Sequence, residues 1–248
     1  MVATNIQPIN SSELAKIKEK LSPFLKEIRK RIIFTVAVFV VATIIGFIFY
    51  EKIIKFLLSL LPLEGINIVF TSPFQFINLA ISCGIATGLV VALPLLIIQV
   101  LSFLKPALKR KEFKRIIKFL PFSVILFLIG FVFGALIMKW QIEVFQAKSV
   151  QLGIGSMLDI SKLLSTFLLI STLMGISFQF PILLLCLVRF DLISRQELSR
   201  KRLWIYLGSF FFAILLPIDS VLADILLSLP LIVLFELTLF LSRVYKRR

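Results

Sequence analysis

Long apolar runs separated by short charged segments dominate the pattern of this chain. Several runs approach or exceed ~18 residues, the length that indicates a transmembrane helix rather than a buried core helix. A membrane β-barrel would instead show ~10-residue segments of alternating polarity, and the sequence has none. The pattern predicts an all-α, polytopic membrane protein. We expect six transmembrane helices, at residues 32–50, 74–103, 116–138, 162–188, 203–216 and 221–242.

The six spans form one integral membrane domain over residues 1–248. We expect an amphipathic cytoplasmic segment at 1–31, a membrane part at 32–242 and a basic tail at 243–248. A cleavable signal peptide is not expected, because the apolar run begins only at Ile32 and no small-residue cleavage site follows it.

The segments between spans also carry patterns. Ser22-Pro23 is typical of a helix start, so the first segment is predicted to form two short helices with a bend. Residues 51–73 include an amphipathic stretch that predicts a helix on the outer interface. Residues 139–161 are expected to form a mixed polar loop.

Charge is distributed unevenly across the predicted membrane. Of 28 Lys and Arg residues, 23 fall in residues 1–31, 104–118, 189–202 and 243–248. Positive residues are enriched in cytoplasmic loops. Both termini are therefore predicted to be cytoplasmic, and the net charge of +15 needs no nucleic-acid partner.

The last two spans are short. Residues 203–216 cover only ~21 Å at ~1.5 Å per residue, against a hydrocarbon core of ~30 Å. Either the bilayer thins here or the turn that joins the two spans lies below the outer surface. The alternative is that both helices are simply packed against longer neighbours.

Three of the polar residues within the predicted spans are candidates for an intramembrane role. Gln179 lies ~15 Å from the basic end of its span, and two interpretations are open: the wall of a polar cavity that accepts a visiting helix, or one interhelical hydrogen bond. Asp224 lies near the outer end of the last span, where its side chain is expected to reach water. Glu236 lies deeper and is expected to pair with a basic or polar group on another helix.

Catalytic chemistry is not indicated. The chain has no histidine, and its two cysteines, Cys83 and Cys186, lie inside apolar runs where they are expected to act as small apolar fillers. No cofactor or metal site and no enzymatic activity is predicted. A secondary transporter of a small molecule or ion remains an alternative, although the two halves show no convincing internal repeat. A membrane-embedded enzyme would need Asp219, Asp224 and a nucleophile to converge.

Several short segments together resemble one family. They are Phe24–Arg31 (FLKEIRKR), Thr71–Phe74 (TSPF), Gln99–Leu108 (QVLSFLKPAL), Gly175–Pro181 (GISFQFP), Pro217–Asp219 and Leu234–Glu236. The first is similar to an HLxELRxRL segment and the fourth to GxxFExP, both typical of TatC, the multispan core subunit of the twin-arginine protein translocase. The resemblance runs from about residue 22 to 245, with six spans.

The resemblance implies a receptor in the cell membrane that binds twin-arginine signal peptides and carries folded proteins across it, driven by the proton-motive force. Single-span TatA and TatB subunits, membrane lipid and further copies of the chain are the implied partners. Glu27 and Glu112 match the acids that face the twin-arginine motif, and Arg29 matches a family arginine. Gln179, Asp219, Asp224 and Glu236 are the intramembrane or partner-docking candidates. The chain departs from the family pattern at Phe24, where a histidine is usual, and at Gln179, where a glutamate is usual.

Overall fold

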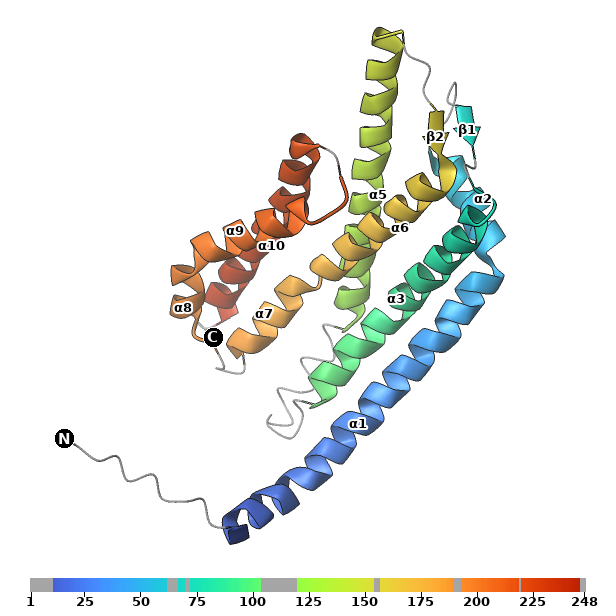
Figure 1. The fold of residues 1–248 in the computed structure, drawn as a ribbon. Coiled ribbons are helices and arrows are strands. Elements are labelled where there is room, and N and C mark those ends of the chain that lie inside the picture. The colour runs from blue at the N-terminus through green and yellow to red at the C-terminus, as the bar shows by residue number, and fades with distance from the viewer. Residues whose placement is uncertain are drawn as a thin grey trace, which may run out of the picture.

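A computed structural model describes residues 11–61, 67–69, 72–103, 120–153, 157–189, 193–218 and 220–245 (Figure 1). The helices and strands are α1 (Ser11–Ile48), α2 (Tyr50–Leu60), β1 (Asn67–Val69), α3 (Gln75–Phe103), α5 (Leu120–Gln151), β2 (Met157–Asp159), α6 (Ile160–Ser177), α7 (Phe180–Arg189), α8 (Arg195–Arg200), α9 (Arg202–Ile214) and α10 (Val221–Tyr245).

Five helical segments in the described part of the chain are long and apolar enough to cross a membrane. They are Lys26–Ile48, Gln75–Ile97, Pro121–Gln151, Ile160–Leu185 and Val221–Arg243. The predicted class of all-α polytopic membrane protein is confirmed. The predicted fifth span corresponds to α9, which has 13 residues and is shorter than these five.

α1 packs against α3, α5 and α3 both pack against α6, and α9 packs against α10 (Figure 1). Glycine permits two of these close approaches. A Cβ at Gly84 would lie 2.8 Å from the carbonyl oxygen of Thr43, and one at Gly130 would lie 2.7 Å from that of Met174. Small residues let membrane helices pack through their backbones, so the α1–α3 and α5–α6 seams depend on glycine.

Two clusters of buried apolar side chains hold the helices together. The larger draws on α2, α3, α5, α6 and α10, and its most buried members include Leu79, Leu164, Phe167, Ile170 and Met174. The smaller joins α7, α8 and α10 through Leu184, Leu198, Phe235 and Leu239. The second cluster fixes the short helix α8 against the end of the bundle.

Two helices differ from their predicted bounds. α1 runs without interruption from Ser11 to Ile48 rather than as two short helices. Pro23 removes one backbone donor and its ring crowds the carbonyl four residues earlier, yet the helix continues through it. α5 extends to Gln151 instead of ending near residue 138. Ile142 is buried in the larger cluster, so the helical face that packs inward continues beyond the apolar run.

The structure contains a strand pair that the sequence did not predict. β1 and β2 pair in parallel, with Asn67 opposite Met157 and Val69 opposite Asp159. Beside it, Asp159 caps α6 by accepting from the backbone N–H of Ser161 at 3.0 Å, and the Gln75 amide donates to Asp159 at 2.5 Å. These contacts join the starts of α3 and α6.

Candidate functional site

An exposed acid lies on α1 where the helix enters its apolar run. The Oε1 atom of Glu27 accepts hydrogen bonds from Arg31, at 2.6 Å from Nη2 and 3.2 Å from Nε. The spacing of four residues places the two side chains on one helical face. Arg31 also donates from Nη1 to the carbonyl oxygen of Gln99, 3.4 Å away in the last turns of α3. Arg31 therefore links Glu27 to the end of α3.

The hydrogen bonds from Arg31 orient the Glu27 carboxylate but engage only one of its two oxygens, Oε1. The Arg31 side chain is 26% exposed and that of Glu27 is 54% exposed. Among the described residues, the Oε2 atom of Glu27 accepts no hydrogen bond. Lys26, Arg29 and Lys30 are exposed beside it. One free carboxylate oxygen remains available to a cationic ligand, and a charge-assisted bond to a guanidinium is among the stronger hydrogen bonds.

The other residues predicted to bind a peptide leader are placed only in part. Arg29 is exposed on α1, two residues from Glu27. Glu112 lies outside the described residues, so the separation of the two acids stays a prediction. Sequence reasoning missed Arg31; its spacing from Glu27 indicates an ion pair, but its contact with α3 follows only from the packing of two distant segments.

Gln179 forms an interhelical hydrogen-bond pair at the break between α6 and α7. The hydroxyl of Ser123 on α5 donates to Gln179 Oε1 at 2.6 Å, and Gln179 Nε2 donates to the carbonyl oxygens of Ser123 at 3.2 Å and Gly175 at 3.4 Å. Ser123 is 2% exposed and Gln179 4%. Of the two interpretations left open by the sequence, this geometry favours the interhelical bond, because both ends of the amide are engaged.

Glu236 pairs with two residues of α9, as expected. The hydroxyl of Tyr206 donates to its Oε1 at 2.5 Å, and Nη2 of Arg202 lies 3.3 Å from its Oε2. The ring of Tyr206 in turn packs edge-on against Phe235. A carboxylate within a membrane helix is thus compensated by one cation and one hydroxyl, and the contacts tie α9 to α10.

Asp224 does not reach water as predicted. Its residue is 8% exposed, and its Oδ1 atom has no hydrogen-bond partner among the described residues. Ala223, Leu227 and Ser228 are also buried. These positions repeat at the spacing of one helical face, so Asp224 lies on the stripe of α10 that packs inward. Asp219 lies outside the described residues.

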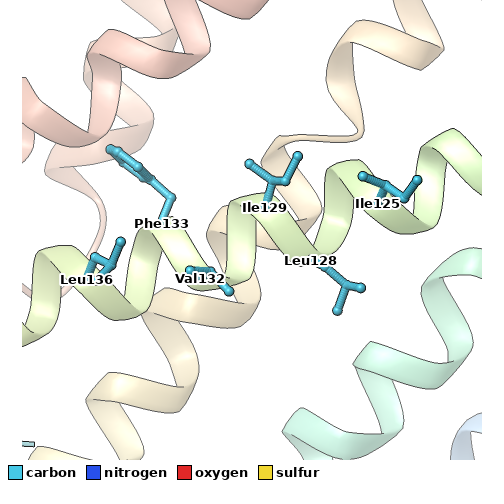
Figure 2. A pocket seen from close by; sticks show the side chains of 6 residues that line it. All are labelled: Ile125, Leu128, Ile129, Val132, Phe133 and Leu136. Carbon is cyan, nitrogen blue, oxygen red and sulfur yellow. The ribbon is translucent and has the colours of Figure 1, made fainter. Parts of the chain in front are cut away.

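A groove with a volume of about 390 Å³ follows one face of α5. Its lining consists of aliphatic and aromatic side chains from successive turns, Ile125, Leu128, Ile129, Val132, Phe133 and Leu136 (Figure 2). Gln179 is not among them, so this groove is separate from the Gln179 site. An apolar hollow on a membrane helix suits a lipid chain or another apolar helix rather than a charged ligand.

The fold and these sites define a polytopic helical membrane protein whose exposed acid is suited to a cationic ligand. The chain matches the family described as "Sec-independent protein translocase protein (TatC)" over residues 23–230. It belongs to the TatC family.

Relatives and solved structures agree with this assignment. The chain is 28% identical to the TatC protein of Carboxydothermus hydrogenoformans over 90% of this chain and 92% of the relative, and 27% identical to that of Escherichia coli K12 over 92% and 89%. A crystal structure titled "Twin Arginine Translocase Receptor- TatC in DDM" superposes with a TM-score of 0.77 at 24% identity, covering 88% of this chain and 99% of that one. The likeness shows that the fold is shared.

Proposed function

We propose that this protein is the receptor subunit of a twin-arginine translocase in the cell membrane. It binds the twin-arginine signal peptides of folded proteins and, with single-span TatA- and TatB-type subunits, moves those proteins across the membrane using the proton-motive force. Membership of the TatC family carries the proposal. The free Glu27 oxygen beside exposed basic residues supports it, because a carboxylate oxygen forms a strong, charge-assisted hydrogen bond with a guanidinium.

The proposed orientation places the peptide site in the cytoplasm. The chain crosses the membrane six times, with α9 as the short fifth span, so both termini are cytoplasmic. The excess of Lys and Arg on that side supports this orientation. In Figure 1, α8, the ends of α3 and α10 and the lower part of α1 lie toward one side of the molecule, and β1 and β2 lie toward the other.

The binding step follows from the charge arrangement. One arginine of the leader bonds to Oε2 of Glu27, while Arg31 keeps Oε1 in place from the opposite side. The second arginine bonds to Glu112, on the segment that follows α3. Arg29 orients the first segment of the chain, which runs into the apolar part of α1. Partner subunits dock near α9 and α10, where Glu236 and Asp224 lie, with Asp219 as a further candidate in the segment that joins these helices, and Gln179 holds the break between α6 and α7.

Site-specific crosslinking of a twin-arginine peptide to the purified protein tests the proposal. We expect Glu27→Gln and Glu112→Gln each to reduce crosslinking strongly, because each removes one carboxylate charge while keeping side-chain size. Glu143→Gln, at an exposed acid on the outer part of α5, is the matched control and should have no effect. A twin-lysine peptide should bind less well than the arginine form, since it lacks the planar fork. Unchanged crosslinking in both acid variants would remove these residues from the site.

A further inference from the structure

The guanidinium of Arg31 contacts two helices at once. Its Nη2 and Nε atoms donate to Oε1 of Glu27, one helical turn earlier on α1, at 2.6 and 3.2 Å. Its Nη1 atom donates to the carbonyl oxygen of Gln99 at 3.4 Å. Gln99 lies in the last turns of α3, where the negative end of the helix dipole favours a cation. Arg31 therefore connects an exposed acid on one helix to the end of another.

The bond to α3 distinguishes Arg31 from an ordinary surface partner of Glu27. An exposed ion pair between residues i and i+4 is weak, because two long side chains must be held in one geometry. The Arg31 side chain is only 26% exposed, and a second helix holds it. The two helices are closely packed, since a Cβ at Gly84 of α3 would lie 2.8 Å from the carbonyl oxygen of Thr43 of α1. The guanidinium is thus a fixed support for the carboxylate.

A carboxylate held in one position can distinguish two spacings between cations. Consecutive Cα atoms lie about 3.8 Å apart, and each further residue extends a chain by at most ~3.3–3.6 Å. The Glu27 side chain is 54% exposed, and its staggered rotamers would place an unsupported carboxylate at points several ångströms apart. An unsupported carboxylate would therefore accept a cation at either spacing, whereas a supported one accepts only the spacing that fits.

We infer that Arg31 is a positioning residue that sets the spacing of the two cations accepted by the leader site. It holds Oε1 of Glu27 toward α3 and leaves Oε2 for one arginine of the leader. The second arginine then reaches the rest of the site only when the chain between the two has the right length. This inference rests on the proposed function, because it takes a twin-arginine peptide as the ligand.

Preorganisation gives the size of the effect. When a side chain with many rotamers is ordered only on binding, the affinity falls by roughly 2- to 12-fold. Arg31 orders the Glu27 side chain before the leader arrives, so a leader of the correct spacing binds without this loss. A leader of the wrong spacing gains less from the ordered carboxylate, since it must move the carboxylate away from Arg31 to reach it.

Arg31→Lys tests this role, because lysine keeps the charge but ends in one nitrogen instead of a planar fork. Fluorescence anisotropy would measure how labelled peptides bind the purified full-length protein, using one leader with adjacent arginines and one with an alanine inserted between them. We expect the native protein to prefer the adjacent form. In Arg31→Lys, binding of the adjacent form should weaken roughly 2- to 12-fold, and binding of the spaced form should weaken less.

Two controls separate positioning from a general effect on the fold. Arg243→Lys makes the same exchange at an exposed position near the end of α10 and should leave the binding of both leaders unchanged. A loss of folded protein would lower the binding of both leaders alike and would not alter their ratio. In a Glu27→Gln background, Arg31→Lys should have little further effect, because Arg31 acts through that carboxylate.

The possible failures are distinguishable. If Arg31→Lys bound the adjacent leader as tightly as the native protein does, or kept the native preference between the two leaders, Arg31 would not position Glu27. If the native protein bound both leaders equally, the site would not read spacing, and the inference would be wrong while twin-arginine binding stood. A native protein that bound a leader with two glutamines as tightly as the adjacent form would refute the proposed function and this inference together.

Discussion

Replacing Ser123 by alanine should loosen the break between α6 and α7. The change deletes one hydroxyl and little volume. It removes the 2.6 Å bond to Gln179 Oε1 but leaves Gln179 Nε2 bonded to the carbonyl oxygens of Ser123 and Gly175. Oε1 then remains buried without a donor, because Gln179 is only 4% exposed. The loss therefore consists of one interhelical bond together with one unsatisfied acceptor.

The size of the effect follows from hydrogen bonds between membrane helices. Such bonds average about 0.6 kcal/mol and reach about 1.7 kcal/mol. Both partners here are buried and the lost bond is short, so we expect Ser123→Ala to cost about 1–1.5 kcal/mol of unfolding free energy. Gln179→Met keeps an unbranched side chain of similar length and removes the amide. It should cost more, because it also leaves the Ser123 hydroxyl without its partner.

Unfolding in mixed micelles with increasing dodecyl sulfate, followed by circular dichroism, would measure these differences. The double variant isolates the coupling between the side chains, which we expect to be about 1 kcal/mol. Ser177→Ala is the control, since among the described residues the Ser177 hydroxyl bonds only to the carbonyl of Leu173 in its own helix. If Ser123→Ala were no more destabilising than Ser177→Ala, or if the coupling were zero, the bond would not hold the helices together.

Two further predictions concern glycine and the cap of α8. Gly130→Ala should destabilise the protein by about 1–3 kcal/mol, because the new Cβ would lie 2.6 Å from Cγ of Phe178. Gly208→Ala, which meets open space, should stabilise α9 by up to about 1 kcal/mol, and the same micelle titration compares the two. In α8, hydrogen bonds from the backbone N–H and hydroxyl of Ser194 lower the pKa of Glu197. Because the pKa is lowered, the cap makes its full contribution to the stability of α8 at pH values above the ordinary pKa of a glutamate. That contribution is lost as the pH falls through the lowered pKa. The protection factors of the α8 amides, which correct for the intrinsic pH dependence of exchange, should fall at acidic pH in the native chain but not in Glu197→Gln.

Much of the helical framework could be predicted from local pattern. The apolar runs located five long helices, and the amphipathic stretch after residue 51 indicated α2. The shortness of the run at 203–216 matched α9. Glu236 was expected to find a partner because an acid surrounded by lipid is costly without one. Each of these inferences needs only the composition of one segment and the thickness of a bilayer.

The features that were missed depend on contacts between distant segments. Nothing local in Asn67–Val69 shows that it pairs with Met157–Asp159. The extension of α5 became clear only from the burial of Ile142, and the inward position of Asp224 from that of its neighbours on α10. Arg31 illustrates the same limit. Its bond to Glu27 follows from spacing along one helix, but its bond to Gln99 spans 68 residues.

The parallel pairing of β1 and β2 has a consequence for the order of biogenesis. In a chain synthesised from its N-terminus, Asn67–Val69 is made long before Met157–Asp159. β2 comes after α3 and α5 in the chain. β1 can therefore form its backbone hydrogen bonds with β2 only after much of the bundle has been synthesised. Every nascent chain that stops before residue 157 therefore carries β1 without its partner strand.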